Sequence, residues 1–284
     1  MWIDSMQRAV DYMEKHLLEG LRIEDIAKEA HMSVYHFQHL FRILTDTSVM
    51  DYCRRRRMTL AAGELMAGRR KVLDLAYKYG YDSPESFSKA FRKQHGMSPR
   101  DARNYNGSLV FYNRLVIQVS LKGVEPMRYQ IMEKEAIRIM GRKERISCKE
   151  GENLKIIPQM WRQFNEDGVL DDLDDWNDGV MEGLIGVCCT IGNGESIDYW
   201  IGASYQGKQP DGSYDMLEIP ASKWAVFEVH GSMPGAIQKV WKQIYSEWFP
   251  SSGFTQGNGP EMEVYPDGDP SSDSYYSEIW IPVK

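Results

Sequence analysis

Residues 72–103 read VLDLAYKYGYDSPESFSKAFRKQHGMSPRDAR and predict a helix, a tight turn and a second helix. Apolar residues recur at helical spacing up to Gly80, which can adopt positive φ, and Ser83 can cap a second helix that buries Phe87 and Phe91. The other face of this second helix is polar and could meet base edges and phosphates in a major groove: Glu85, Ser86, Lys89, Arg92 and Lys93. The alternative is an ordinary helical hairpin with a solvated charged face.

The same pattern occurs a second time, fifty residues upstream. The residues that repeat are the capping serine, the two buried phenylalanines and the arginine after them: Ser33, Phe37, Phe41 and Arg42 stand where Ser83, Phe87, Phe91 and Arg92 stand. A duplicated helix-turn-helix is a far more specific signal than a single hairpin. The repeat therefore favours the nucleic-acid interpretation.

This pattern resembles the AraC/XylS family of bacterial transcription regulators. The resemblance covers about residues 5–104 and includes the closing GMSP at 96–99 and Arg103. It implies an all-α N-terminal domain in which one long helix joins two helix-turn-helix units, and a single chain that reads two major-groove segments. His31 and Asp46 depart from the family, which often has glycine there, but both residue types tolerate a left-handed backbone.

Position in the family motif selects the candidate DNA contacts. They lie on the two recognition helices: Tyr35, Gln38, His39 and Arg42 on the first, and Glu85, Ser86, Lys89 and Arg92 on the second. Gln38 can pair with adenine and Tyr35 can pack on thymine methyl groups, whereas plain solvent exposure is the alternative for His39. In the basic run 54–57, one or two arginines could reach phosphate, with the others solvated or paired with carboxylates.

Charge divides the 284-residue chain into two parts. The net charge is −7, but residues 1–107 carry 18 Lys and Arg against 14 Asp and Glu, and residues 108–284 carry 16 against 27. The resulting +4 and −11 predict a DNA-binding domain over 1–107 and an effector domain over 108–284. We expect a cytoplasmic protein with no membrane contact, because there is neither an apolar run of 18 residues nor a basic, apolar leader.

No metal or cofactor site is expected. The four cysteines contain no CxxC, so four reduced thiols are the better interpretation than a disulfide frame or a zinc site. The acidic run DDLDDWND at 171–178 lacks the glycine and the terminal Glu of a calcium loop, and we interpret it as a solvated loop.

Beyond a short polar hinge at 104–108, helical periodicity gives way to β-rich segments. The expected strands are 115–123, 129–131, 136–141, 184–190, 197–205, 224–231, 263–265 and 275–283, with helices from Pro158 and over 234–249. Two strand-helix-strand-strand units predict an α+β domain with two helices on one curved antiparallel sheet. A groove between its halves is the natural ligand site.

This second half resembles the gyrase-inhibitor-like (GyrI-like) effector-binding domain. The resemblance spans about 115–284 and rests on the order of several short motifs: AIRIMG at 136–141, WAVFEVHG at 224–231, EWFPSSGF at 247–254, PEMEVY at 260–265 and SEIWIPVK at 277–284. It implies a small hydrophobic or cationic effector.

Strand alternation singles out Glu278 as the candidate effector-recognising residue. Tyr276, Glu278 and Trp280 share one face of the last strand, which places a carboxylate between aromatic rings that attract an organic cation. The resemblance implies the same role for this position. The alternative is a structural carboxylate bonded to a neighbouring Tyr, with Trp280 in the core. Three aromatic residues are weaker candidates for the same site: Trp200, Trp224 and Tyr265.

The sequence thus predicts a one-component transcription regulator without catalytic residues. Its expected partners are promoter DNA, a small hydrophobic or cationic effector and RNA polymerase. Two alternatives stay open for the C-terminal domain. It could be a hydrolase of small electrophiles with Glu278 as general base, although no nucleophile and base pair is visible in the sequence, or it could bind another protein.

Overall fold

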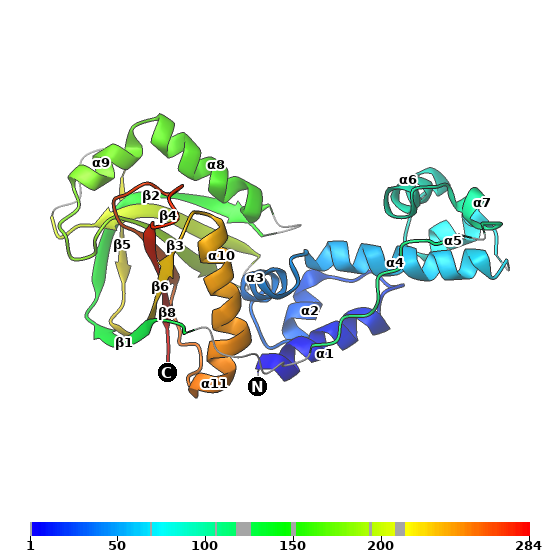
Figure 1. Ribbon diagram of the computed structural model, residues 1–284, viewed down its shortest axis with the longest axis horizontal. Helices are drawn as coiled ribbons and strands as arrows, with labels where there is room; N and C mark the ends of the chain where they lie inside the picture. The colour runs from blue at the N-terminus through cyan, green and yellow to red at the C-terminus, as the bar shows by residue number, and fades with distance from the viewer. Residues whose placement is uncertain are drawn as a thin grey trace. The chain divides into compact units, whose positions relative to one another are not determined.

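The computed structural model describes residues 2–68, 70–105, 107–117, 126–148, 152–192, 195–207 and 214–284. The chain divides into two compact units, Met1–Gln118 and Val119–Lys284 (Figure 1). The division falls after the predicted boundary at residue 107. No helix within the described residues is long and apolar enough to span a membrane.

The N-terminal unit is helical. Its helices are α1 (Trp2–Lys15), α2 (Ile23–Glu29), α3 (Val34–Thr45), α4 (Val49–Met66), α5 (Val72–Lys78), α6 (Pro84–His95) and α7 (Pro99–Ala102). The pairs α2–α3 and α5–α6 are the two predicted helix-turn-helix units, and α4 is the predicted joining helix. The recognition helices α3 and α6 each bury a phenylalanine pair completely, which explains why the repeat preserves these positions.

Local backbone geometry agrees with the turn residues in the sequence. The hydroxyls of Ser33 and Ser83 accept hydrogen bonds from the backbone N–H three residues on, which caps α3 and α6. Gly96 ends α6 with φ 77°, and Asp46 ends α3 with φ 53°. His31 has φ 55° in the first turn. Both departures from glycine therefore keep the left-handed conformation that the turns require.

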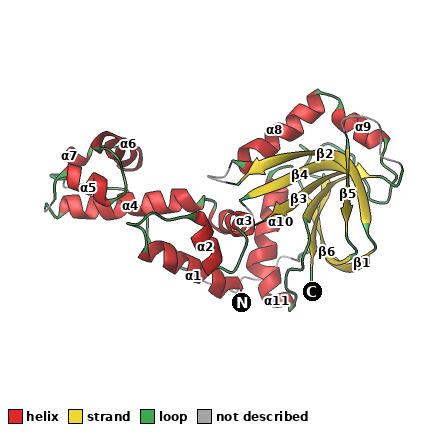
Figure 2. Ribbon diagram, turned by 180° about the vertical axis from the view of Figure 1, so that it is seen from behind, coloured by secondary structure: helices red, strands yellow, loops and turns green. Residues whose placement is uncertain are grey.

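The C-terminal unit is built on one curved antiparallel sheet (Figure 2). Its strands are β1 (Tyr129–Lys134), β2 (Ile137–Ser147), β3 (Leu184–Ile191), β4 (Ser196–Ser204), β5 (Asp215–Ile219), β6 (Ser222–His230), β7 (Glu261–Tyr265) and β8 (Tyr276–Pro282). Their order across the sheet is β1-β6-β8-β7-β3-β4-β2-β5.

Two strand-helix-strand-strand units supply six of the eight strands of this sheet, as the sequence predicts, and β1 and β5 lie at its two edges. The helices are α8 (Asn153–Glu166), α9 (Val169–Asp175), α10 (Gly235–Gln243), the π-helical turn η2 (Ile244–Trp248) and α11 (Phe249–Ser252). The first unit is β2-α8-β3-β4 and the second is β6-α10-β7-β8, and they meet where β3 pairs with β7.

The sheet has two different faces. On the helix face lie Tyr199, Glu263 and Ile279, and this face contacts α8 and α10 through Trp161 and Trp241. On the core face lie the members of one buried cluster: Ile137, Ile139, Ile185, Val187, Trp200, Ile219, Trp224, Val226, Met262, Val264 and Trp280, with Met181 from the loop before β3.

The structure differs from the expected elements at five places. Pro158 lies inside α8 and does not start it. Residues 169–175 form α9, because Val169 and Leu173, one turn apart, bury an apolar pair beneath the acidic residues. Strand β5 was not expected, and the helix over 234–249 is interrupted by η2. Residues 115–117 are irregular and bond to the N-terminal unit, and the rest of the expected strand at 115–123 lies outside the described residues.

Candidate functional site

Helix α6 presents its predicted contact residues to solvent. Glu85, Ser86, Lys89 and Arg92 are all exposed, while Phe87 and Phe91 hold the opposite side of the helix in the core. A polar, partly basic helix face of this kind can enter a major groove.

Helix α3 differs from the expectation at one residue. Arg42 is exposed, and Gln38 and His39 are half-buried. Tyr35, predicted to face outward, is only 6% exposed. Its ring stacks on the His39 imidazole one turn later, with centroids 5.5 Å apart and an interplanar angle of 13°.

The basic run on α4 forms contacts within the N-terminal unit. Arg54 and Arg55 both pair with Asp51. Arg56 bonds to Glu14 on α1, and Arg57 donates to the carbonyl oxygen of Leu17 at 2.6 Å. Arg56 and Arg57 therefore connect α4 to α1 and to the residues that follow α1, whereas Arg54 and Arg55 form ion pairs within α4.

In the C-terminal unit, five of the six predicted effector residues lie on the core face: Tyr276, Glu278, Trp280, Trp200 and Trp224. Glu278 accepts hydrogen bonds from the Tyr276 hydroxyl at 2.5 Å and from Trp280 Nε1 at 2.7 Å. The indoles of Trp280 and Trp224 pack edge to face, with centroids 5.9 Å apart. The carboxylate of Glu278 thus lies among aromatic groups, and both of its oxygens are bonded to them.

Charged groups surround Glu278 at the end of β8. Glu228 is its direct partner across the β6–β8 pair. Arg128 Nη1 lies 3.8 Å from Glu228 and offsets part of the repulsion between the facing carboxylates, and His230 Nε2 lies 3.2 Å from the same carboxylate. Lys134 lies 5.9 Å from the centroid of the Trp280 ring, a position from which it can interact with the ring's π-system.

The sixth predicted residue, Tyr265, belongs to a second carboxylate site on the helix face. Its hydroxyl donates to Glu263 at 2.8 Å, and Trp241 Nε1 on α10 donates to the other oxygen of Glu263 at 2.7 Å. Trp161 on α8 packs edge to face on Tyr265 and donates to the Tyr199 hydroxyl at 2.8 Å. Residues from both strand-helix-strand-strand units therefore converge on Glu263.

The surroundings of Glu263 disfavour its negative charge. Burial raises the pKa of this carboxyl, the hydrogen bonds from Trp241 and Tyr265 lower it in part, and the nearby Glu261 charge raises it again. The net pKa is above the usual range. Glu263 nevertheless keeps some accessible surface. A cation placed beside it would favour the charged form and so lower the pKa of this carboxyl again.

A glycine makes room for this site. Gly186 faces Glu263 across the β3–β7 pair. A Cβ atom at Gly186 would lie 2.5 Å from the Tyr199 hydroxyl and 3.4 Å from a ring carbon of Trp161. Only the absence of a side chain lets these two rings lie against the strand.

Sequence reasoning missed the roles of Glu263, Trp241, Trp161, Tyr199 and Gly186. A signal was present in EMEVY, where Glu261, Glu263 and Tyr265 alternate on one face in the same way as Tyr276, Glu278 and Trp280 do. Which of the two carboxylates meets other aromatic side chains depends on where the helices lie.

Within the described residues, no group of three or more His, Cys, Asp or Glu side chains is arranged to hold a metal ion. Cys53, Cys148, Cys188 and Cys189 are free thiols.

Comparison with known proteins places both units. Residues 127–284 match the GyrI-like small molecule binding domain, and residues 26–105 match a helix-turn-helix domain. The regulatory protein SoxS of Escherichia coli (strain K12) is 35% identical over 99 residues, which are 35% of this chain and 92% of SoxS.

Two solved structures resemble the C-terminal unit. SAV2435 bound to tetraphenylphosphonium is 29% identical with a TM-score of 0.51, and the match covers 56% of this chain and 94% of that one. A putative bacterial transcription regulation protein from Staphylococcus aureus MU50 is also 29% identical, with a TM-score of 0.50 and coverage of 56% and 99%. The chain thus joins an AraC-type DNA-binding domain to a small-molecule-binding domain, and it belongs to the AraC-type transcription regulators and to the GyrI-like family.

Proposed function

We propose that this regulator responds to a lipophilic organic cation, which binds on the helix face of the C-terminal sheet beside Glu263. The observation that carries the proposal is a carboxyl whose pKa is raised by burial and which lies among Trp161, Tyr199, Trp241 and Tyr265. An aromatic surround stabilises a cation through the negative faces of its rings, and a carboxylate supplies the matching charge. The solved relative SAV2435 binds a compound of this class, tetraphenylphosphonium.

The core-face carboxylate, Glu278, is the second candidate for the same role. It also lies between aromatic rings, and the order of motifs in the sequence favours it. Its two oxygens are bonded to Tyr276 and Trp280 on its own strand. Glu263 is bonded instead to Trp241 on α10 and to Tyr265 on its own strand, and Trp161 on α8 packs on Tyr265. A ligand that moved α8 or α10 would therefore change the surroundings of Glu263 first.

The N-terminal unit binds promoter DNA through α3 and α6 in this proposal. We assign the contacts to Gln38, His39 and Arg42 on α3 and to Glu85, Ser86, Lys89 and Arg92 on α6; Tyr35 would need to leave its stacked position to take part. RNA polymerase is the further partner through which such a regulator acts, and promoter binding places the protein in the cytoplasm.

We propose no catalytic role for either carboxylate. Each accepts hydrogen bonds from a Trp and a Tyr, an arrangement that suits recognition of charge better than proton abstraction. Hydrolysis of small electrophiles is the alternative, and turnover of such a compound by the purified protein would favour it.

The test is a titration of the full-length protein with tetraphenylphosphonium and with neutral triphenylphosphine oxide, followed by tryptophan fluorescence and calorimetry. We expect saturable binding that prefers the cation. Glu263→Gln should weaken it by about tenfold or more, a loss of about 1.4 kcal/mol. Glu278→Gln is the matched variant on the other face and should bind with wild-type affinity.

Each other outcome has a definite meaning. Loss of binding in Glu278→Gln but not in Glu263→Gln would move the site to the core face. Wild-type affinity in both variants, or a preference for the neutral compound, would contradict recognition of a cation by either carboxylate.

A further inference from the structure

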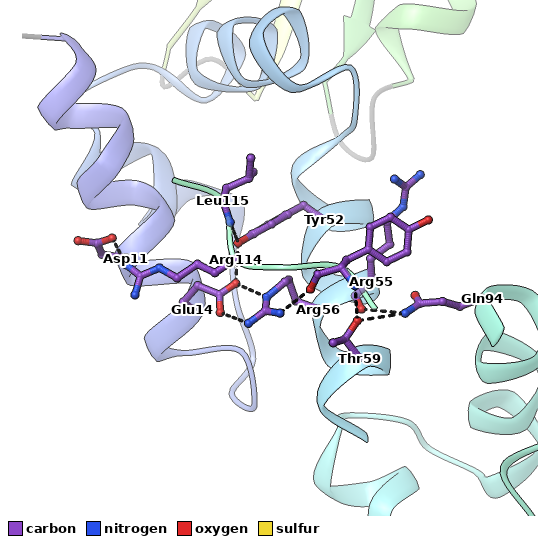
Figure 3. A network of polar contacts seen from close by, with 10 residues as sticks. Asp11, Glu14, Tyr52, Arg55, Arg56, Thr59, Gln94, Arg114 and Leu115 are labelled. Carbon is purple, nitrogen blue, oxygen red and sulfur yellow. Dashed lines mark hydrogen bonds and ion pairs between the residues drawn. The ribbon is translucent and has the colours of Figure 1, made fainter. Parts of the chain in front are cut away.

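Residues 107–117, here called the brace, connect the second helix-turn-helix unit to α1, which packs against α2 of the first unit (Figure 3). The brace follows α7, which comes after the second helix-turn-helix unit, and it runs back along α4 to α1. The sequence predicted a hinge up to residue 108, an effector domain from residue 108 and a strand from residue 115, so contacts of these residues with the DNA-binding unit were unexpected.

The start of the brace is anchored in the second unit. Leu109 is 9% exposed and packs in the same hydrophobic cluster as Phe91. Gln94 Nε2 on α6 lies 3.3 Å from the carbonyl oxygen of Val110. These contacts tie the brace to the recognition helix α6 through its buried side and its last turn.

The middle of the brace is bonded to α4. The backbone N–H of Tyr112 donates to the Thr59 hydroxyl at 3.0 Å, and its carbonyl oxygen accepts from Arg56 Nη1 at 2.6 Å. The Arg55 guanidinium lies 4.9 Å from the centroid of the Tyr112 ring. Both polar backbone groups of Tyr112 are therefore bonded to side chains of α4.

The end of the brace is bonded to the first part of α4 and to α1. The backbone N–H of Leu115 donates to the Tyr52 hydroxyl at 3.1 Å, and that of Ile117 donates to Gln7 Oε1 on α1 at 3.1 Å. Arg114 pairs with Asp11 on α1. Specific side chains thus accept three backbone N–H groups along the brace, from Tyr112 to Ile117.

The attachment point is itself held firmly. Tyr52 donates to Glu14 on α1 at 2.6 Å, and Arg56 binds both oxygens of the same carboxylate at 2.7 and 2.9 Å. Burial acts to raise the pKa of Glu14, but the bonds from Arg56 and Tyr52 outweigh it and hold the pKa below its usual range. The brace therefore ends on a charged network that already joins α1 to α4.

The two recognition helices are linked both by α4 and by the brace, and two links fix the distance between these helices better than one. The helix α4 has 18 residues, and long helices are rarely straight. A second chain segment attached at both ends closes a frame around α4 and opposes such bending. The two recognition helices read half-sites about 34 Å apart, so a small bend changes which spacing fits.

We propose that the brace fixes the distance between α3 and α6 and thereby makes the protein selective for one spacing between the two halves of its operator. This inference rests on the proposed binding of DNA by both recognition helices. The residues that carry it are Gln94 at one end, Thr59 in the middle, and Tyr52, Gln7 and Arg114 at the other end.

The test uses a duplex selected from random DNA by the full-length wild-type protein, and versions of it with one or two base pairs inserted between the half-sites. Tyr52→Phe/Thr59→Val removes the two hydroxyls that accept brace amides and keeps the side-chain volumes nearly unchanged. Gln7→Ala/Arg114→Ala detaches the far end through two side chains near or at the surface. Tyr77→Phe on α5, whose side chain is 60% exposed, is the control.

We expect both double variants to lose about tenfold of the wild-type preference for the selected spacing, because each loses two of the contacts that attach the brace. The control should keep that preference. In hydrogen exchange of the full-length protein, the amides of Tyr112, Leu115 and Ile117 should be protected in the wild type and exchange faster in the variants.

Unchanged spacing preference in variants whose brace amides exchange faster would overturn the proposal and leave α4 alone to set the distance. Brace amides that exchange at unprotected rates in the wild type would also overturn it. Failure of the wild type to select any duplex would instead refute the proposed DNA-binding role, so the two failures are distinguishable.

Discussion

Individual residues with the same chemistry take different roles here because of their surroundings. Glu263 and Glu278 lie on opposite faces of one sheet, and each accepts hydrogen bonds from a Trp and a Tyr. Glu263 receives them from α10 and its own strand, under two helices, and burial raises its pKa. Glu278 receives them from its own strand and faces Glu228. The difference comes from packing and not from the residue type.

His95 provides a pH prediction at the same scale. It is 6% exposed, with Nε2 3.3 Å from the Met58 carbonyl oxygen and its ring 4.3 Å from that of Phe91. Burial lowers its pKa, and the bond to Met58 offsets this only in part. In the unfolded chain its pKa is about 6.5, so below that pH the unfolded state binds more protons and the folded state is destabilised.

We therefore expect protection of the α6 amides from hydrogen exchange to fall between pH 7.5 and 5.5, after correction for the intrinsic rate. His95→Gln should reduce this loss, because glutamine does not titrate. The same loss of protection in both proteins would show that groups other than His95 cause it.

At the scale of elements, glycine and short apolar pairs decide where structure forms. The acidic run at 171–175 is helical because Val169 and Leu173 bury their side chains. On β3, Gly186 accepts the rings of Tyr199 and Trp161 against its backbone. Both cases depend on side chains from other elements of the fold, which the sequence pattern of one segment does not reveal.

Gly186→Ala should destabilise the C-terminal unit by about 1–3 kcal/mol, because the new methyl group overlaps the Tyr199 hydroxyl. The displacement should also break the hydrogen bond from Trp161 to Tyr199 and weaken binding of tetraphenylphosphonium. Thermal denaturation and the titration measure the two effects.

Gly235→Ala in the first turn of α10 is the control for this substitution. A Cβ atom there meets nothing within 4 Å, and its φ is not positive, so we expect little change or a small gain in stability. Wild-type stability and affinity in Gly186→Ala would contradict the role of this glycine.

At the scale of the whole molecule, the distribution of charge agrees with a DNA-binding part and a small-molecule-binding part. Positive charge is concentrated in residues 1–107, with a net +4, whereas residues 108–284 carry −11. Part of the basic charge is used internally, since Arg54 to Arg57 bind groups of the N-terminal unit. We therefore expect phosphate contacts from other exposed cations such as Lys89.

Lys89→Ala should weaken binding to the selected duplex at low salt and lower the slope of log affinity against log salt by about one, because one phosphate contact is lost. Fluorescence anisotropy over a range of salt concentrations measures this slope. Lys155→Ala, an exposed lysine on α8, should leave it unchanged. A Lys89→Ala slope equal to that of the wild type would remove Lys89 from the phosphate interface.

The sequence by itself determined the duplicated helix-turn-helix, its caps and its joining helix, because each depends on periodicity and turn residues within a short segment. It also determined the two strand-helix-strand-strand units. Only the tertiary structure decided which carboxylate lies beneath α8 and α10, and that residues 107–117 return to α1. The site around Glu263 brings together Trp241, Trp161 and Tyr199 from elements far apart in the chain. Tertiary packing sets this convergence, and no local sequence pattern specifies it.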